Sequence, residues 1–558
     1  MSAPTETELK LAVALRDVRR LRARLAALVV RAAPQRARLD NVYYDTADDL
    51  LARHRMALRV RRIGRRWVQT LKTGETNAAL ATRGEWEMPA PNGRLDLSRF
   101  AATPLAELLA QHPQAQVAPR FRTRFDRTTW LYKNAQAAIE VALDVGEITT
   151  ADEPLRRAPI CEVELELKAG APQALLDVAL HLVAPTDQAA ASALALLPAG
   201  RSKAARGHAL VHGEQLAPLK ADAAAVTRGL SAAITAPEAL RKVAGNVAAA
   251  LLANAEGVLA ADDPEFVHQA RVALRRLRAA VTLLRSHVAF PAALTDELRW
   301  IAGELGAARD ADVFVETTLP MILQAVPDED AATRIGAAAQ RRRRQARTHA
   351  RAALASPRFA LLVLRLMAWS LEPMPATAAG ANDEAGPAAE SAVAANEEVA
   401  EPTDTAVAAN EEIAGLTDMA VAANEEVARP TDTAAGADEE VALSTVAAAV
   451  LDAAHGKLMR RARKFRKRSP TRRHRVRIAA KRLRYALDMF AVVLPPSPTA
   501  RFVRRLASLQ DALGAMNDAV VARRMLATFA RRGGSSAWRQ RADEHLQEME
   551  AHHIDDAA

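Results

Sequence analysis

The sequence is poor in cysteine, in aromatic residues and in long uncharged apolar runs, and each shortage excludes a class of protein. Cys161 is the single cysteine among 558 residues, which excludes a disulfide framework and a cysteine-rich zinc site. Aromatic residues make up 4% of the chain, and alanine supplies much of its 50% apolar content, which favours helices over an all-β protein. No run approaches the roughly 20 uncharged apolar residues of a membrane span, and no secretory signal is visible. We therefore expect a cytoplasmic protein without a membrane partner.

Acidic residues are scarce outside one segment, so the net charge of +10 understates how basic the rest of the chain is. Residues 376–445 hold 16 Asp+Glu and only Arg429 as a cation; without them, 75 Lys+Arg face 50 Asp+Glu, a net charge of +25. A 14-residue repeat begins there at Ala392, Ala406 and Ala420. Few bulky apolar residues are present, so we expect a disordered acidic insert rather than a coiled coil of two heptads per repeat. The basic remainder predicts an anionic partner, whether nucleic acid, an anionic membrane or polyphosphate.

Residues 1–212 contain about eight short runs in which apolar and polar residues alternate, which is typical of an antiparallel sheet or barrel. The runs are ETELKLAV, NVYYDT, ALRVRR, WVQTLKT, GEWEMP, FRTRFDRTTW, AIEVALDVG and ICEVELELK. Two amphipathic stretches, 17–30 and 172–183, predict helices packed against this sheet. From about residue 220 the apolar spacing is helical, so we predict an all-α domain over 220–548, interrupted by 376–445. The predicted fold class is therefore α+β.

The charged residues of the predicted strands gather on one face of each strand, opposite a face of Val, Leu and Ile. Alternation aligns Glu6, Glu8 and Lys10; Arg59 and Arg61; Glu85 and Glu87; Arg122 and Arg124; Glu140 and Asp144; and Glu162, Glu164, Glu166 and Lys168. A solvated outer face is the ordinary explanation for one strand. Because many strands share the pattern and the apolar faces need cover, we favour a closed sheet with a charged lumen. Carboxylates suit Mg²⁺ or Mn²⁺, and Arg and Lys suit phosphate oxygens, so such a lumen suits a metal–polyphosphate complex.

The helical region contains an internal repeat with a charged stripe. HQARVALRRLR from His268 recurs as HRVRIAAKRLR from His474, and LGAARDADV from Leu305 recurs as LGAMNDAVV from Leu513. We therefore predict a duplicated helical bundle with the acidic insert in a loop between its halves. Spacings of 3, 4 and 3 place one histidine and three cations of each copy on one helix face. These residues are His268, Arg271, Arg275 and Arg278, and His474, Arg477, Lys481 and Arg484.

An exposed, solubilising face is the commoner explanation for one such helix, but its recurrence favours a composite anion site between the two halves. One histidine per helix, with arginine neighbours, is a poor metal site. Other cations cluster at Arg341–Arg344 and from Arg460 to Arg475, and these clusters could bind RNA or DNA. Few aromatic residues lie among them, so nucleic acid is possible but not favoured.

Six motifs of the N-terminal region occur in an order that resembles the CYTH, or triphosphate tunnel metalloenzyme, superfamily. They are Glu6-x-Glu8-x-Lys10, NVYYDT, ALRVR, LDVGEI, CEVELELK and SKAARG from Ser202 to Gly207, and together they cover residues 5–210. The resemblance implies an eight-stranded antiparallel β-barrel, a tunnel with flanking helices. It also implies that a triphosphate is held by Lys10, Arg59, Arg61, Lys72, Arg124 or Arg127, and Lys203. Arg127 fits the family's Arg-x-x-aromatic pattern through Trp130, but it lies off the face of Arg122 and Arg124 unless a bulge intervenes.

The resemblance further assigns carboxylates to one or two divalent metal ions and to the attacking water. Glu6, Glu8, Glu162 and Glu164 would hold Mg²⁺ or Mn²⁺, and Glu85, Glu140, Asp144 and Glu166 would complete the acidic wall by holding metal or orienting water. Lys10 would neutralise phosphoryl charge during catalysis. Which carboxylate acts as the base stays open at this point.

The duplicated helices resemble a CHAD domain, the conserved histidine α-helical module, which implies a helical bundle that binds polyphosphate along a basic channel. A CYTH domain followed by a CHAD domain resembles bacterial inorganic triphosphatases, so we expect metal-dependent hydrolysis of inorganic triphosphate. The alternatives are a class IV adenylate cyclase, a thiamine or nucleoside triphosphatase, and a non-enzymatic polyphosphate-binding or granule-targeting protein. No Walker loop is present, so a P-loop NTPase is not expected. The sequence does not predict an oligomeric state.

Overall fold

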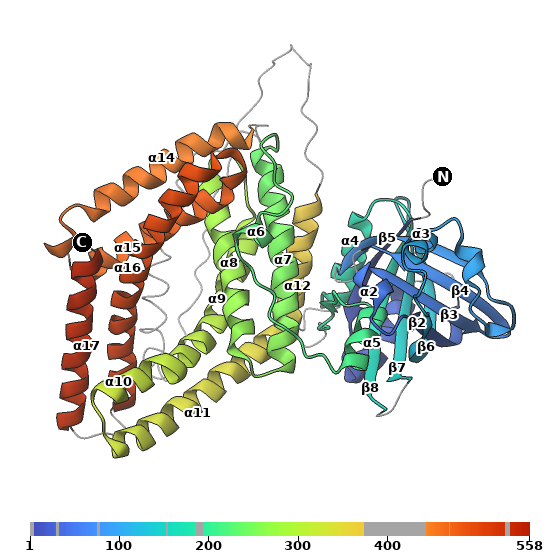
Figure 1. The fold of residues 1–558 in the computed structure, drawn as a ribbon, viewed down its shortest axis with the longest axis horizontal. Coiled ribbons are helices and arrows are strands. Elements are labelled where there is room, and N and C mark those ends of the chain that lie inside the picture. The colour runs from blue at the N-terminus through green and yellow to red at the C-terminus, as the bar shows by residue number, and fades with distance from the viewer. Residues whose placement is uncertain are drawn as a thin grey trace, which may run out of the picture.

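The computed structural model describes residues 5–28, 33–74, 79–151, 155–185, 193–372, 442–467, 469–530 and 536–557. Within these ranges the chain forms a β-rich N-terminal part and a helical C-terminal part (Figure 1). Of the insert predicted at 376–445, residues 376–441 lie outside the described residues. Its predicted end is corrected, because helix α14 begins at Leu443.

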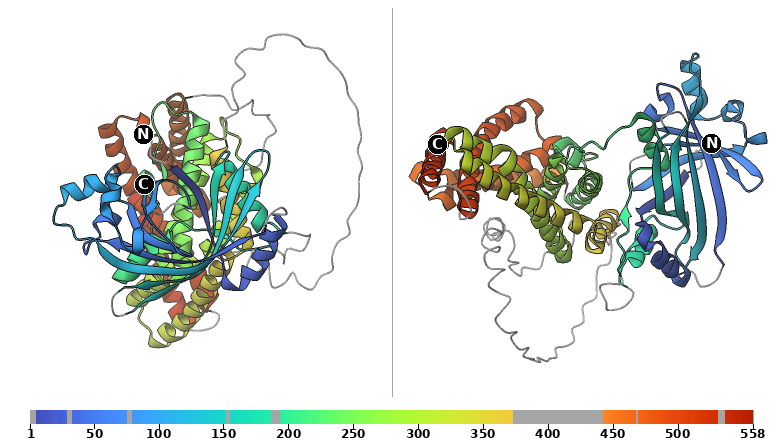
Figure 2. Two further views of the ribbon diagram at one scale, coloured as in Figure 1. Left: turned by 90° about the vertical axis from the view of Figure 1, so that its right-hand side faces the viewer. Right: turned by 90° about the horizontal axis from the view of Figure 1, so that it is seen from below.

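The N-terminal sheet contains eight long strands. Their bounds are β1 Thr5–Ala12, β2 Gln35–Asp45, β3 Met56–Ile63, β4 Arg66–Thr73, β5 Leu80–Pro89, β6 Ala118–Lys133, β7 Ala138–Thr150 and β8 Arg157–Ala169. The strand order is β5-β4-β3-β2-β6-β7-β8-β1, and every pairing is antiparallel. β1 also pairs with β5, which closes the sheet, and the two-residue β9, Leu197–Pro198, pairs with the end of β1. The predicted eight-stranded antiparallel barrel is confirmed, and Figure 2 shows its curvature.

Helices cover the apolar outer face of this barrel. Leu9 and Leu11 of β1 are fully buried in a cluster with leucines of α1, Val18–Leu28, and α4, Gln173–Val183, the two helices that amphipathicity predicted. Side chains alternate along a strand, so burying Leu9 and Leu11 outside turns Glu8 and Lys10 into the barrel. The short helices α2, Leu50–Arg53, and α3, Pro104–Gln111, cover another cluster, around Leu71.

The C-terminal part is wholly helical in the described residues. Its α-helices are α6 Ala223–Val226, α7 Ala236–Ala260, α8 Pro264–Leu284, α9 Ala292–Val313, α10 Leu319–Ala325, α11 Glu329–Leu354, α12 Pro357–Leu371, α14 Leu443–Ala462, α15 Pro470–Met489, α16 Pro496–Ala530 and α17 Ser536–Ala557. A π-helical turn, Phe314–Thr318, joins α9 to α10. The predicted domain end at residue 548 is corrected, because it falls within α17.

The duplication is visible in how the two halves meet. α8 and α15 carry the two copies of the charged motif, and Arg276 of α8 donates to Asp488 of α15 at 2.8 Å. Thr235 and Ala442, the residues directly before α7 and α14, form an antiparallel bridge, so corresponding helices begin side by side. The duplicated helical bundle predicted from the repeat is confirmed.

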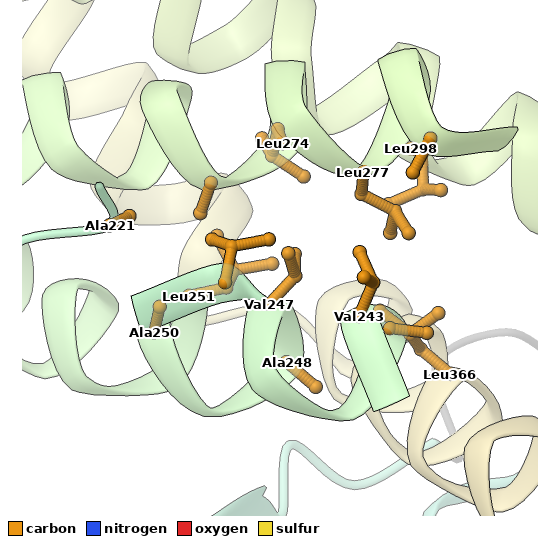
Figure 3. Close-up of a cluster of buried hydrophobic side chains, with 14 of the residues drawn as sticks. Ala221, Val243, Val247, Ala248, Ala250, Leu251, Leu274, Leu277, Leu298 and Leu366 are labelled. Atoms are coloured by element: carbon orange, nitrogen blue, oxygen red, sulfur yellow. The ribbon is translucent and has the colours of Figure 1, made fainter. Parts of the chain in front are cut away.

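The largest apolar core of the bundle lies between α7, α8, α9 and α12. Val243, Val247 and Leu251 of α7 face Leu274 and Leu277 of α8 (Figure 3). Contrary to the expectation from the sequence, α7 is long and apolar enough to cross a membrane, with a mean hydropathy of 1.4 in its most apolar 18-residue window. Since 61% of that window is buried inside the protein, packing in this core accounts for its composition.

Helix α12 packs against both parts of the chain. Phe359 and Leu366 belong to the bundle core, whereas Ala360 and Leu364 pack with Leu175 and the neighbouring outer leucines of the barrel. The barrel and the bundle therefore share a buried apolar interface between α12 and α4.

Candidate functional site

The barrel lumen holds a cavity of about 240 Å³ with a charged lining. Twelve of the residues selected from the sequence line it: Glu6, Glu8, Lys10, Arg59, Arg61, Lys72, Glu85, Arg127, Glu140, Glu164, Glu166 and Lys203. The prediction of a charged lumen is therefore confirmed, because the closed sheet leaves its charged faces inside and its apolar faces under the helices.

One wall of the lumen pairs cations of β4 and β5 with carboxylates of β1. Lys72 Nζ lies 2.5 Å from Glu6 Oε2 and 3.4 Å from Glu85 Oε1. Lys10 contacts Glu8, and Arg83 Nη2 lies 2.7 Å from the same carboxylate. Burial lowers the pKa of Lys10 although Glu8 opposes the shift.

Arg83 was missed in the sequence, although the available signal included it. The strand alternation that aligned Glu85 with Glu87 places Arg83 on the same face. Arg83 is 6% exposed and lines the cavity.

A second wall is organised around Lys203, the first residue of α5, Lys203–His212. Ser202 caps this helix by accepting from Ala205 N, which fixes where Lys203 enters the lumen. Lys203 Nζ lies 2.7 Å from Asp144, 2.5 Å from Glu162 and 3.0 Å from Glu164. Burial opposes its charge, but these carboxylates outweigh burial and raise the pKa of Lys203. The three carboxylates thus favour the charged form of Lys203 at this end of the lumen.

Arg127 joins this second wall from β6. Its guanidinium donates two parallel bonds to Asp144, each at 2.7 Å, and also contacts Glu164. Burial disfavours the charge of Glu164, but Lys203 and Arg127 hold its pKa well below the usual range.

The two arginines of β3 differ in how the lumen compensates their charge. Burial disfavours the charge of Arg59, but Tyr43 and Glu85 outweigh burial and raise its pKa, whereas the charge of Arg61 is compensated incompletely. Burial, followed by repulsion from Arg59 and Arg127, lowers the pKa of Arg61 to about 9. Arg61 donates from Nε to Asn41 Oδ1 at 2.7 Å, and the nearest carboxylate to Arg59 is Glu85 at 3.8 Å. An anion between these two guanidinium groups would relieve their repulsion, and phosphate oxygens match their geometry.

The lumen also contains carboxylates that repel one another. Burial raises the pKa of Glu166, and the charges of Glu6 and Glu140 raise it further against the opposing contact with Lys168. Asp144, Glu162 and Glu164 form a tighter group, with one oxygen from each within 4.8 Å of the others, but Lys203, Arg127 and Arg206 already pair with them. Glu6, Glu140 and Glu166 also line the cavity and offer oxygen donors of the kind that a hard divalent cation prefers, with Lys72 paired to Glu6 and Lys168 to Glu166.

Three sequence-selected residues do not line the cavity. Arg124 lies on the outer face of β6, 51% exposed and 3.5 Å from Asp40, so its assignment to the triphosphate is corrected. The β6–β7 register runs without a bulge through this stretch, which leaves Arg127 as the inward arginine. Asp144 and Glu162 are buried behind the lining and hold Lys203 in place.

The two charged stripes of the helical part come together between α8 and α15. Burial lowers the pKa of Lys481 to about 7, and the nearby charges of Arg477 and Arg275 lower it further. Burial likewise lowers the pKa values of Arg271 and Arg477. Four cations from two halves of the chain thus come together with only partial compensation from Asp310 and Asp518, and we call Arg271, Arg275, Arg477 and Lys481 the basic channel.

The remaining stripe residues lie around this channel. Arg278 is next to Arg299 and Arg271, and His268 is next to Arg309; burial lowers the pKa of each. Arg484 is drawn to Asp488 at 3.2 Å, and His474 is half-buried on α15.

The repeated segments that begin at Leu305 and Leu513 place further residues at the channel. Asp310 faces Arg271, and burial raises its pKa. Asp518, the equivalent residue of the second copy, lies 4.0 Å from Arg477. A Cβ at Gly306 would lie 2.6 Å from Arg271 Nη1, so this glycine leaves room for the Arg271 side chain to donate to Ala302 O at 3.0 Å.

Comparison with known proteins agrees with this two-part architecture. Residues 4–192 match the family model of the CYTH domain, and residues 242–412 and 407–527 match that of the CHAD domain. An inorganic triphosphatase of Haemophilus influenzae is 35% identical over 175 residues, which are 31% of this chain and 46% of that protein. The chain thus spans less than half the length of this relative.

Several solved structures are similar at low overall superposition. The CHAD domain of the plant Ricinus communis is 27% identical, with a TM-score of 0.41 over 61% of this chain and 91% of that one. PptA from Streptomyces chartreusis is 20% identical, with a TM-score of 0.31 over 58% of this chain and 96% of that one. A Hippeastrum protein described as having a dominant triphosphatase activity is 16% identical, with a TM-score of 0.25 over 38% and 98% of the two chains.

Proposed function

Because this chain belongs to the CYTH and CHAD domain families, with the CYTH domain preceding the CHAD domain, we propose that it is a metal-dependent inorganic triphosphatase that also binds polyphosphate. The observation that carries the proposal is a lumen in which the charge of Arg61 lacks full compensation beside a group of mutually repelling carboxylates. A triphosphate with a divalent cation supplies both missing charges. The relative from Haemophilus influenzae supports the inorganic substrate.

Different cations of the lumen bind different parts of the triphosphate. Arg59 and Arg61 bind terminal phosphoryl oxygens, and Lys72 adds a third cation from the neighbouring strand β4. Lys203 and Arg127 close the second wall, where their bonds to Asp144 and Glu164 fix their positions before substrate arrives. Such preorganised cations stabilise the charge that develops on the phosphoryl oxygens in the transition state.

The metal ion would be held by Glu6, Glu140 and Glu166, with Glu8 nearby on β1. A divalent cation bound there would neutralise phosphoryl charge and orient the triphosphate. Hydrolysis forms one bond from a water oxygen to phosphorus and breaks one phosphoanhydride bond, which yields orthophosphate and diphosphate. We assign Glu166 or Glu85, the lumen carboxylates beside the cations, to orient that water.

The basic channel is the site that we propose for polyphosphate. Arg271, Arg477 and Lys481 are half-buried and Arg275 is exposed, and the four cations come from two different helices, so a flexible chain of phosphates can reach all four at once. Because a phosphate chain offers no bases to stack, the scarcity of aromatic residues favours it over nucleic acid.

A substrate panel tests the catalytic half of the proposal. Purified protein is incubated with Mg²⁺ or Mn²⁺ and, separately, with tripolyphosphate, ATP, thiamine triphosphate and long-chain polyphosphate, while phosphate and cyclic nucleotide release are followed. We expect tripolyphosphate to be hydrolysed fastest. If no substrate is hydrolysed with either metal, the proposal is wrong. If cyclic AMP is the main product from ATP, the protein is instead an adenylate cyclase.

A further inference from the structure

A second group of metal-ligating side chains lies away from the lumen cavity, between α5 and the β2–α2 connection. His208 and His212 are one turn apart on α5, so both project from the same side of the helix. They meet Asp45, the last residue of β2, and Asp49, which directly precedes α2. The four side chains come from segments about 160 residues apart in the sequence, and none of them belongs to the phosphate site.

Asp49 lies between the two imidazole rings. Its Oδ2 is 2.5 Å from His212 Nε2, and its Oδ1 is 3.5 Å from His208 Nδ1. The other nitrogen of His208, Nε2, is 3.6 Å from Asp45 Oδ2. Asp45, Asp49 and His208 each offer one ligand atom within 4.8 Å of the others.

The group is held rigidly and still has unused ligand atoms. Asp45 is fully buried and accepts from Thr46 N at 2.7 Å, Leu51 N at 2.9 Å and Ala52 N at 3.0 Å, which fixes its carboxylate. Asp49 Oδ1 and His208 Nδ1, which face each other, are buried and have no hydrogen-bond partner among the described residues.

One cation adjoins the group, and an aromatic stack supports it. Arg120 Nη2 lies 4.0 Å from Asp49 Oδ1, too far for a hydrogen bond. The ring of His208 packs edge-on against Phe121 with centroids 5.2 Å apart, and Phe121 stacks on Tyr43 of the lumen lining at 4.6 Å. These contacts orient the His208 ring between the two carboxylates.

We propose that Asp49, His208 and His212 bind a first-row transition-metal cation of the Zn²⁺ type, with Asp45 orienting His208 from behind. Two imidazole nitrogens select such a cation over Mg²⁺, whereas the lumen offers oxygen donors only. Ligation through His208 Nδ1 leaves Nε2–H directed at Asp45, the arrangement in which a carboxylate fixes a metal-binding histidine. Three protein ligands leave a fourth position for water.

The position of the site gives it a structural consequence for the lumen. α5 begins with Lys203 and also carries Arg206, which donates to Glu162 at 2.8 Å. A metal ion that ties α5 to the β2–α2 connection would stabilise the helix that delivers these cations. The site does not depend on which substrate the lumen hydrolyses.

Metal binding by the full-length protein tests the proposal directly. Chelator-treated protein is titrated with Co²⁺ as a spectroscopic probe and with Zn²⁺ by calorimetry, in excess Mg²⁺ so that the lumen carboxylates are occupied. We expect one Co²⁺ with visible ligand-field bands, displacement by Zn²⁺, and a melting temperature that rises with Zn²⁺ because the folded state binds it.

Matched variants assign the bound ion to these residues. His208→Ala and His212→Ala should abolish the bands, and Asp45→Asn should weaken binding by about ten- to a hundredfold. His181→Ala, an exposed histidine of α4, and Glu6→Gln in the lumen should leave the titration unchanged. The proposal is overturned if wild-type protein neither binds Co²⁺ nor is stabilised by Zn²⁺, or if folded His212→Ala protein binds as wild type does.

Discussion

Lys203 in the barrel and Lys481 in the helical part are both largely removed from solvent, yet their pKa values move in opposite directions. Three carboxylates within 3.0 Å raise the pKa of Lys203 despite burial. Burial and two arginines lower the pKa of Lys481 to about 7, and no ion pair joins Lys481 to a carboxylate in the described part of the chain.

The difference shows what kind of anion each region can bind. Carboxylates already position most of the lumen cations, so the lumen suits a short substrate whose charge a metal ion partly neutralises. The channel cations repel one another, and Asp310 and Asp518 offset that repulsion only in part, so an external anion would relieve it further. A long, highly charged phosphate chain suits it better than a single small ion.

The largest expected effect separates the two regions by function. Lys10→Ala should reduce the kcat for tripolyphosphate by about a hundredfold or more, because a buried cation at the phosphoryl group is lost. Retention of long-chain polyphosphate should be unchanged, since Lys10 lines the barrel lumen and the barrel lies apart from α8 and α15 (Figure 1). Equal loss of both activities would contradict the division between lumen and channel.

The second expected effect is on stability, and it compares an inward with an outward arginine of β6. Arg127→Ala removes the bidentate partner of fully buried Asp144 and should lower the free energy of unfolding by about 3 kcal/mol. Arg124→Ala, the matched outward control, breaks a half-exposed pair and should cost within about 1 kcal/mol. Urea unfolding followed by circular dichroism measures both. A larger cost for Arg124→Ala would show that the inward face of β6 has been misassigned.

The third effect concerns the channel alone. Arg271→Ala combined with Arg477→Ala should weaken polyphosphate binding by about tenfold per cation, because each arginine supplies a charge-assisted bond to phosphate. The slope of log affinity against log salt should fall by about two, one for each lost cation. Arg334→Ala, exposed on α11, is the control. An unchanged affinity in the double variant would remove polyphosphate from the channel.

The smallest effect is a pH dependence. Lys481 is protonated below about pH 7 and neutral above it, so polyphosphate affinity at fixed salt should fall several-fold from pH 6 to pH 8. Folded protein binds fewer protons than unfolded protein between about pH 7 and 10.5, so this group's contribution to stability rises with pH across that window. Lys481→Arg should flatten the affinity profile, because arginine keeps its charge. An unaltered profile in that variant would assign the dependence to another group.

Sorting residues by strand face predicted much of the lumen but failed at β6. Glu6, Glu8, Lys10, Arg59 and Arg61 line the cavity as alternation required. On β6, alternation aligned Arg122 and Arg124, which point outward. The inward positions beside them hold Phe121 and Phe125, which pack under α5. A pattern of period two shows which residues share a face but not which face is inside.

The sequence by itself determined the two-part architecture, the duplication of the helical region and the identity of most charged lumen residues. Alternation, helical spacing and an internal repeat are local patterns, and secondary structure follows from them directly. Only the tertiary structure decided which arginine of β6 enters the lumen, that Asp144 and Glu162 serve Lys203, and that His208 meets Asp45. These outcomes depend on barrel closure and on the packing of α5, which bring distant residues together, and no local pattern encodes them.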